Sequence, residues 1–356
     1  MPVNPAARRV TIAVGLLLVA VLAVVVSSVS VPYVVFAPGV AVDTLGTVGG
    51  QQVVSVSGRR TYPTDGTLDL TTINVTRSGS RLGLAETFSA WVDGDRQVQP
   101  RGLVYPDSQS SAQAEQAGQQ EMASSQEAAV IAAARQLGIP VTERTLVSRV
   151  ETGGPAAGKL SAGQQILAVD GKAVTGPADL ASAVRSHKPG SIVVFKVAAG
   201  TTPTLTPVRL GAAPTDSGIP AGSGYLGIGL AQDAHAPVQA DIQLGQKIGG
   251  PSAGLMFSLA IVDRLTPGTL PGDVHVAGTG TIDGRGTVGA IGGVAEKMLG
   301  ARAAGASVFL VPAANCAEAA AHPVDGLRLV RVQDLAGAVT AIQAASAGRM
   351  AALPRC

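Results

Sequence analysis

The sequence predicts an α+β protein that begins with a membrane-spanning helix. Short segments rich in Val, Ile and Thr, typical of strands, alternate with segments that have helical patterning. The 45 glycines and 22 prolines indicate many turns between short elements. A length of 356 residues suits about two domains, at roughly 150 residues per domain. Hydrophobic residues make up 46% of the chain, which is ample for a packed core and excludes a wholly disordered protein.

The membrane-spanning helix is expected over residues 10–31, a run without a charged residue. As a helix this run is about 33 Å long, enough to cross a bilayer. Arg8 and Arg9 precede it, and the next basic residues lie well downstream. The positive-inside rule then predicts a single-pass protein of the cell membrane, with residues 1–9 in the cytoplasm and the rest outside. The alternative is a cleaved signal peptide, although the apolar run is longer than a usual signal core.

The remaining elements follow from patterning and turn residues. Residues 33–75 favour β structure, and residues 108–120 are polar and predict an exposed segment. Further strands are expected over residues 145–150, 165–169, 191–197, 274–281, 308–311 and 327–330. Helices are expected over residues 124–137, 177–186, 255–265, 295–304 and 332–345. Ser124 or Ser125 is expected to cap the first of these helices. Residues 201–224, rich in Thr, Pro and Gly, predict a linker or a domain edge.

Several classes of function are excluded. With 26 basic and 24 acidic residues, the chain lacks the concentrated positive charge of a nucleic-acid binder. Two cysteines cannot build a Cys-rich zinc site, and no H-E-x-x-H motif occurs. No G-x-x-x-x-G-K-[ST] loop is present to hold the phosphates of ATP. We therefore expect no metal and no cofactor. Whether Cys316 and Cys356 are free or form a disulfide stays open.

One segment carries the pattern of a nucleophile. Residues 249–254, GGPSAG, lead directly into an apolar helix. Small residues around a single serine allow a substrate backbone to approach closely. The unpaired N–H groups at a helix N-terminus could stabilise the oxyanion of an acyl-transfer reaction. Ser252 is therefore a candidate nucleophile, but serine needs a base to become reactive.

Lys297 is the better candidate for that base. None of the four histidines lies in a motif with an acidic partner; they are His187, His235, His275 and His322. Lys297 lies near the start of an expected helix with apolar neighbours, in a chain that has only six lysines against 20 arginines. A desolvated lysine can give up its proton near neutral pH, whereas an arginine cannot.

The two segments together resemble the proteolytic domain of the Lon family of serine proteases. The match comprises GGPSAGLMFSLAIVDRLT and GDVHVAGTGTIDGRGTVGAIGGVAEKMLGARAAGASVFLVP. The resemblance implies a Ser–Lys dyad with Ser252 as nucleophile and Lys297 as general base. It also implies a supporting role for Thr279 near the lysine and for Gly250 beside the serine. Gly249 departs from the family, which usually has an acidic residue at that position.

A second resemblance lies upstream. The segments LVSRVETGGPAAGKLSAGQQILAVDGKAV and PADLASAVRSHKPGSIVVFKVAAG resemble a bacterial PDZ domain, over residues 139–212. Such a domain offers one sheet edge to an extended peptide, with backbone N–H groups that hold the peptide's terminal carboxylate. Leu137, Gly138 and Ile139 are expected to form that carboxylate-binding loop. The alternative is a vestigial groove in a module that only positions its neighbour.

The PDZ-like module is expected to be an insertion. Residues 67–75 and 125–139 resemble the first strand and first helix of the Lon-type domain. The chain as a whole resembles the membrane-anchored PDZ–Lon-like serine proteases of bacteria, of the actinobacterial type. The expected order is a cytoplasmic N-terminus (1–9), a transmembrane helix (10–31), the N-terminal part of the protease domain (32–138), the PDZ-like domain (139–212), the catalytic part of the protease domain (213–346) and a tail (347–356).

The expected function follows from both resemblances. It is a membrane-anchored serine endopeptidase that hydrolyses peptide bonds of protein substrates, with an extracytoplasmic catalytic domain and no ATPase module of its own. The expected partners are protein or peptide substrates and the membrane, with no nucleic acid. The resemblance also implies a homo-oligomer, a hexamer. The alternative is a catalytically silent, membrane-tethered PDZ adaptor that binds C-terminal peptides.

Overall fold

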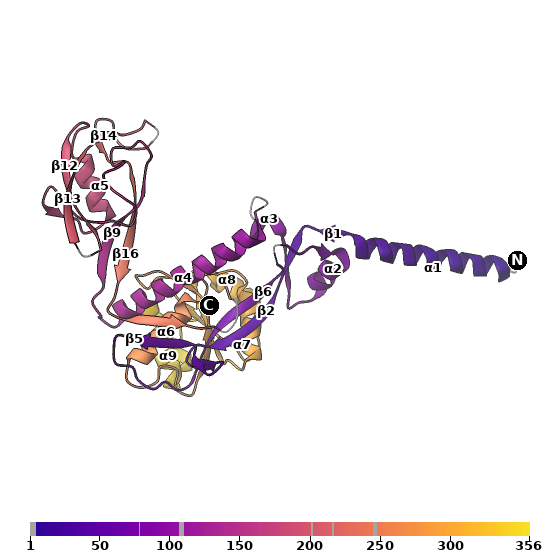
Figure 1. The fold of residues 1–356 in the computed structure, drawn as a ribbon. Helices are drawn as coiled ribbons and strands as arrows, with labels where there is room; N and C mark the ends of the chain where they lie inside the picture. Colours follow the sequence, from indigo (N-terminus) through magenta and orange to yellow (C-terminus); the bar gives the residue numbers. More distant parts are fainter. Residues whose placement is uncertain (1–4, 78, 107–109, 201, 216, 245–247) are drawn as a thin grey trace. The chain divides into compact units, whose positions relative to one another are not determined.

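The computed structural model describes residues 5–77, 79–106, 110–200, 202–215, 217–244 and 248–356 (Figure 1). The chain divides into two compact units. The first consists of Met1–Gly138 and Val238–Cys356, and the second is Ile139–Pro237. The second unit is thus an insertion into the first.

The N-terminal helix α1 (Pro5–Ser28) overlaps most of residues 10–31. Among the described residues, no helix combines the length and the apolar character that a membrane crossing requires. The crossing therefore stays a prediction of the sequence. After α1 the chain forms β1 (Ser30–Val31), which pairs with β7 (Leu82–Gly83). The helix α2 (Leu84–Val92) follows β7 and was not expected from the sequence.

A mixed sheet forms the centre of the first unit. In spatial order its strands are β22 (Arg328–Val332), β21 (Val308–Pro312), β18 (His275–Gly278), β6 (Thr67–Val75), β2 (Tyr33–Asp43) and β8 (Gln97–Pro100). The first four are mutually parallel, and β2 and β8 are antiparallel to their neighbours. Both faces of this part are covered, and β21, whose five residues are all buried, is accordingly a continuous apolar run.

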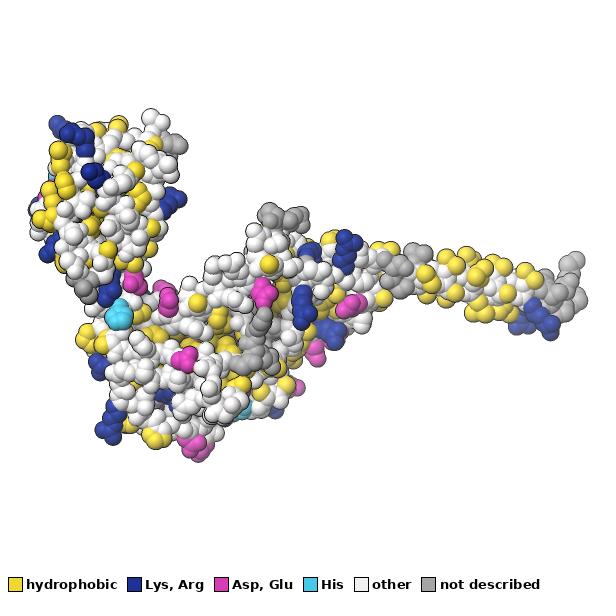
Figure 2. Space-filling view, viewed as in Figure 1, with side chains coloured by type: hydrophobic (Ala, Val, Ile, Leu, Met, Phe, Trp, Pro, Cys, Tyr) yellow, Lys and Arg dark blue, Asp and Glu magenta, His cyan; other side chains and the backbone are white. Residues whose placement is uncertain are grey.

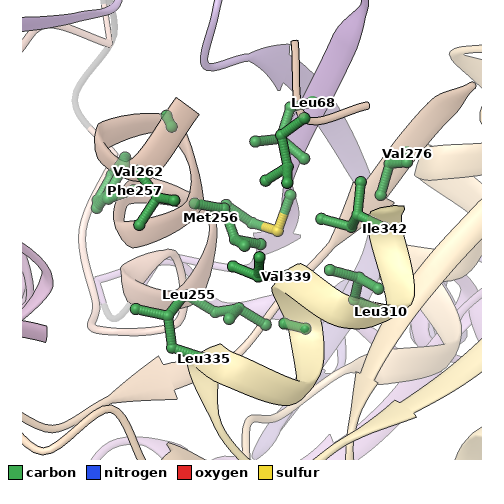
Figure 3. Packing of buried hydrophobic residues seen from close by; sticks show 14 of the residues in the cluster. Leu68, Leu255, Met256, Phe257, Val262, Val276, Leu310, Leu335, Val339 and Ile342 are labelled. Atoms are coloured by element: carbon green, nitrogen blue, oxygen red, sulfur yellow. The ribbon is translucent and has the colours of Figure 1, made fainter. Parts of the chain in front are cut away.

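Successive side chains of these strands enter two different cores. Val308 and Leu310 of β21 pack in a cluster with α4 (Ser111–Gln136), α6 (Gly254–Leu265) and α9 (Leu335–Ser346). Figure 3 shows labelled side chains of α6 and α9 directed toward those of the strands. Phe309 and Val311, on the opposite face, pack with α7 (Val294–Ala303) and α8 (Cys316–Ala321).

The helix α4 begins much earlier than the sequence predicts. Ser110 forms a capping box with Gln113: its hydroxyl accepts from the Gln113 N–H, and the Gln113 side chain accepts from the Ser110 N–H. The expected exposed segment is thus helical from Ser111 onward, while residues 108 and 109 lie outside the described residues. Ser124 and Ser125 lie inside the helix and cap nothing, so the prediction of a cap at either residue is wrong.

Short elements complete the first unit. They are β3 (Thr47–Val48), β4 (Gln51–Gln52), β5 (Val54–Ser57), β17 (Gln239–Ile242), β19 (Thr281–Ile282), β20 (Val288–Gly289), α3 (Arg101–Val104) and the 3-10 helices η1 (Ala313–Asn315) and η2 (Met350–Ala352). Cys316 and Cys356 form a disulfide. It fixes the C-terminal segment, where Leu353 is buried and the Pro354 carbonyl accepts from the Arg331 N–H.

The second unit is a small sheet covered by one helix. Its strands, in spatial order, are β13 (Thr202–Arg209), β12 (Ile192–Ala199), β10 (Gln165–Val169), β9 (Thr142–Val150) and β16 (Ile228–His235). The other elements are β11 (Lys172–Ala173), β14 (Gly211–Ala212), β15 (Gly224–Tyr225) and α5 (Pro177–Arg185). Leu180 of α5 packs in one core with Val193 and Phe195 of β12.

Two expected boundaries change in this unit. β13 pairs with β12 over its whole length, so much of the expected linker over residues 201–224 is a strand of the sheet. Thr201 and Asp216 lie outside the described residues. The unit begins at the expected residue 139 but extends past the expected residue 212 to Pro237, because β16 pairs along β9.

Candidate active site

Ser252 lies on a short loop that leads into α6. The residue before the helix is Ala253, so the serine is close to the helix N-terminus, as its sequence context predicts. Gly250 has a φ of +89°, a conformation that favours glycine. Its N–H donates to the Gly118 carbonyl of α4 at 2.9 Å. Gly250 therefore supports the loop by docking it on α4, and its N–H is not free to contact a substrate.

The helix α4 holds the loop at a second point. The Ser125 hydroxyl donates to the Pro251 carbonyl at 3.0 Å. Gly254 leaves room for this contact, since a Cβ there would lie 2.7 Å from the Ser125 Oγ. Sequence reasoning missed this role of Ser125, because no local motif shows which distant loop a helix residue contacts.

Lys297 of α7 contacts the side chain of Ser252. Its side chain is buried, with 2% of its surface exposed. The ammonium donates to the Ser252 Oγ at 2.8 Å and to the Thr279 Oγ1 at 2.9 Å. Burial lowers the pKa of Lys297 from 10.5 to about 7, because a buried site disfavours the charged form. A large fraction of this amine is therefore neutral near pH 7.

Thr279 connects the two residues. It follows β18 directly and is fully buried. Its hydroxyl donates to the Ser252 carbonyl at 3.0 Å while accepting from Lys297. The Ser252 carbonyl also accepts from the Gly280 N–H at 2.8 Å. The sequence-predicted residues Ser252, Lys297 and Thr279 thus lie together, with the lysine held between two hydroxyl oxygens.

The neutral form of this arrangement can transfer a proton. A neutral amine has one lone pair and two N–H groups. At 2.8 Å the lone pair of Lys297 can accept from the Ser252 O–H while an N–H still donates to Thr279. His275, the histidine expected within a strand, is instead paired with Asp69 at 2.7 Å.

A cleft of about 650 Å³ opens in front of the serine. Its larger apolar side chains are Phe36, Val40, Leu70, Ile73, Val75, Met122, Ile248 and Ile291. Among the described lining residues, Lys297 is the one with an ionisable side chain. A second hollow, of about 770 Å³, shares Ile73 and Ile248 with this cleft and extends it toward Tyr105. The surface next to Ser252 therefore suits apolar groups.

One wall of the cleft is a free sheet edge. β6 pairs with β18 only through Leu70, where β18 ends at Gly278. Residues 71–75 continue along β2 on their other side and line the cleft. Among the described strands, none pairs with residues 72–75 on the side of β18. An extended peptide could use these backbone groups as a further strand would.

Asn315 supports the opposite wall and was not predicted. Its side-chain oxygen accepts from the Ile291 N–H, and its amide donates to the Ile291 carbonyl, each at 2.9 Å. Ile291 lines the cleft. Asn315 therefore clamps the backbone of a cleft residue on both sides. The sequence contains no signal for this, since the two residues are joined only by the fold.

The expected carboxylate-binding loop of the second unit is not at a free edge. Leu137 ends α4, Gly138 has a φ of +66°, and Ile139 is buried. The strand that follows, β9, is paired with β10 on one side and β16 on the other. Pairing with β10 covers only Thr145 and Leu146, whereas β16 pairs along β9 from Thr142 to Val150. Binding of a peptide terminus by Leu137, Gly138 and Ile139 stays a prediction of the sequence.

β16 is one of the two edge strands of the sheet in the second unit, and β13 is the other. Among the described strands, only β9 pairs with β16. Leu230 of β16 and several residues of α5, including Ala181 and Arg185, line a hollow beside it. Residues 224–227 lead into this strand, and Gly227 has a φ of +71°. The sequence held a signal here, because Tyr225-Leu226-Gly227-Ile228 sets a glycine among apolar residues directly before a strand.

Comparisons with known families agree with both units. Residues 241–341 match the Lon protease (S16) C-terminal proteolytic domain, and residues 124–208 match the PDZ domain. The chain thus contains a region that matches the Lon-type proteolytic domain and a region that matches a PDZ domain.

Individual relatives match over limited segments. The Lon protease of Clostridioides difficile is 48% identical over 63 residues, 18% of this chain and 8% of that protein. Lon protease 1 of Herpetosiphon aurantiacus is 40% identical over 99 residues, 28% of this chain and 12% of that protein. The chain therefore spans only about a tenth of the length of these curated relatives.

Solved PDZ domains also match. The PDZ domain of an SdrC-like protein from Listeria monocytogenes is 27% identical and covers 24% of this chain and 85% of that structure, with a TM-score of 0.22. The corresponding domain from Listeria innocua is 26% identical and covers 24% and 92%, with a TM-score of 0.22.

Proposed function

We propose that this protein is a membrane-anchored serine endopeptidase in which Ser252 and Lys297 form the catalytic dyad. The observation that carries the proposal is the 2.8 Å contact between the Lys297 Nζ and the Ser252 Oγ. Both residues line the apolar cleft, and burial lowers the pKa of Lys297 to about 7. A nucleophile in contact with a base that is neutral near pH 7 is the minimum that acyl transfer needs.

The reaction proceeds through an acyl-enzyme. Lys297 takes the hydroxyl proton as the Ser252 Oγ attacks the substrate carbonyl carbon, and the resulting ammonium then gives that proton to the leaving amine. The same lysine takes a proton from the water that attacks the ester and returns one to Ser252 as the acid leaves. Thr279 holds the lysine toward the serine. The Ser252 N–H has no partner among the described residues, and it suits the oxyanion.

The substrate is an extended, unfolded segment of a protein. Residues 72–75 offer the backbone groups of a free strand edge along the cleft. The apolar lining next to Ser252 favours apolar side chains around the cut bond. In the second unit, β16 and α5 receive the C-terminal tail of a protein.

The membrane anchor is the helix α1. The uncharged run over residues 10–31 and the double arginine before it support this proposal. Figure 2 shows hydrophobic side chains along the visible face of α1. In this arrangement residues 1–9 lie in the cytoplasm and both compact units lie outside it. Assembly into a hexameric ring stays a prediction from the resemblance to Lon-type domains.

Replacement of the nucleophile tests the proposal. Ser252→Ala should abolish hydrolysis of an unfolded protein such as casein, because no other group can form the acyl-enzyme. A fluorophosphonate probe should label the unaltered protein at Ser252 and leave the variant unlabelled. Ser258→Ala, at the next serine along the chain, within α6, is the matched control for labelling. Hydrolysis within tenfold of the unaltered protein in Ser252→Ala would contradict the dyad; no cleavage and no labelling in the unaltered protein would favour the silent adaptor.

A further inference from the structure

The helix α2 presents an apolar face to solvent. Leu84, Phe88, Trp91 and Val92 are exposed by 39%, 62%, 71% and 64%. Their spacing places them on one side of the helix. The opposite side holds the small residues Thr87 and Ala90, which are buried against the rest of the unit. The larger apolar side chains of α2 thus point outward, the reverse of an ordinary surface helix.

This face lies next to the end of the proposed anchor. The Leu84 N–H, at the first residue of α2, donates to the Val29 carbonyl at 2.9 Å. Val29 directly follows α1, and β1 pairs with β7 immediately before α2. The helix α1 contacts α2, yet the four outward side chains remain exposed. The backbone therefore holds α2 at the level where α1 ends.

The chemistry of this face suits the interfacial region of a bilayer. Tryptophan is enriched where a membrane meets water, because its ring is largely apolar and its N–H can be hydrated. The ring centroids of Phe88 and Trp91 lie 6.1 Å apart, so the two aromatic side chains form one surface. From Arg77 to Arg101 the chain has four basic and three acidic residues. This near balance indicates that apolar burial, and not attraction to anionic lipid, would drive the contact.

We propose that the outward face of α2, formed by Leu84, Phe88, Trp91 and Val92, inserts into the outer interface of the membrane in which α1 anchors the protein. This inference rests on the proposed anchor. An interfacial helix buries its apolar face about 5–10 Å into the boundary between headgroups and acyl chains. With α1 and α2 both held by the membrane, the first unit has two points of attachment. Its orientation relative to the bilayer is then fixed, which a single flexible tether would not achieve.

Trp91 is the only tryptophan in the chain, so its fluorescence reports on this face alone. The experiment uses the full chain in phosphatidylcholine vesicles whose lipids carry bromine at a shallow or a deep acyl carbon. Shallow bromine should quench Trp91 more strongly than deep bromine. The double variant Phe88→Ser, Val92→Ser should lose most of this quenching. Leu205→Ser, at an exposed leucine of the second unit, should retain it.

Retention of the protein with vesicles after carbonate washing separates the two proposals. A protein that washes off refutes the anchor and, with it, this inference. A retained protein whose Trp91 is unquenched by bromine and open to aqueous acrylamide refutes the inference and leaves the anchor standing. Trp91 shielded from both quenchers would show that a protein surface covers α2, such as a second copy of the chain, and would equally refute insertion.

Discussion

The proposed role of Lys297 as a base requires a neutral amine. Burial favours this form, because it lowers the pKa of Lys297 to about 7. Among the described residues, no carboxylate forms an ion pair with this lysine. Its neighbour Glu296 is also buried, and burial raises the pKa of that carboxyl. The site is therefore built from desolvated groups and hydroxyls, not from an ion pair that would keep the lysine charged.

The rate of peptide hydrolysis should depend on the protonation of Lys297. A protonated lysine cannot accept the Ser252 proton, so kcat/KM should fall as pH drops through about 7 and level off above it. A fluorogenic peptide assayed from about pH 5 to 9 measures this. Lys297→Arg should be inactive at every pH, since a guanidinium does not deprotonate. A flat profile across pH 7, or an active arginine variant, would show that another group is the base.

The same pKa predicts a cost in stability. The folded pKa of about 7 lies below the ordinary lysine value of 10.5, so between these values the unfolded chain binds more protons and stability rises with pH. Below pH 7 the buried charge should cost on the order of a few kcal/mol. Lys297→Met should therefore raise Tm relative to the unaltered protein at pH 6, and the difference should shrink toward pH 10. A difference independent of pH would contradict the lowered pKa.

At the scale of elements, the position of the serine depends on α4. Gly118 and Ser125 of this helix form hydrogen bonds with the Gly250 N–H and the Pro251 carbonyl, in the two residues directly before Ser252. Gly249 permits this close packing, because a Cβ there would lie 3.3 Å from the Gly118 carbonyl carbon. The reaction geometry is thus set by an element far away in sequence.

Ser125→Ala should weaken catalysis more than substrate binding. Removing the hydroxyl leaves the Pro251 carbonyl without its partner, a loss of about 1–3 kcal/mol, and loosens the loop. We expect kcat to fall by about tenfold with KM little changed. Ser124→Ala, at the exposed neighbouring serine, is the matched control and should behave as the unaltered protein. Equal effects of both variants would mean that α4 acts only through general stability.

The elements also show how far the sequence could be interpreted. The helix α6 and strand β21 were expected within a residue or two, because apolar runs and breakers mark them locally. The proximity of Ser252 and Lys297 could be expected only from the family resemblance. The start of α4 was missed because a capping box in a Ser/Gln-rich stretch resembles a loop. The free edge of β16 was missed because pairing partners depend on topology, which local patterns do not encode.

At the scale of the whole molecule, the second unit is an insertion with its own core. Its buried cluster includes Val147 of β9, Leu180 of α5 and Leu226, which lies just before β16. The pairing of β16 with β9 runs from Ile228 to His235. A deletion that begins at residue 139 and ends between β13 and β16 would remove β9 and leave β16 without its partner strand. It would also expose the apolar surface of Leu226 to water.

Excision of Ile139–Pro237, replaced by a short flexible linker, should leave a folded protease. Hydrolysis of a short peptide should stay within about threefold of the unaltered protein, because the dyad and its supporting residues all lie in the first unit. Cleavage of a protein with a free C-terminal tail should fall further, since the β16 edge is lost. The variant that lacks residues 139–210 is the contrasting control. It should aggregate, because β16 has lost its partner strand β9. Equal losses on peptide and protein in the variant without Ile139–Pro237 would show that the inserted unit supports the protease fold and does not deliver substrate.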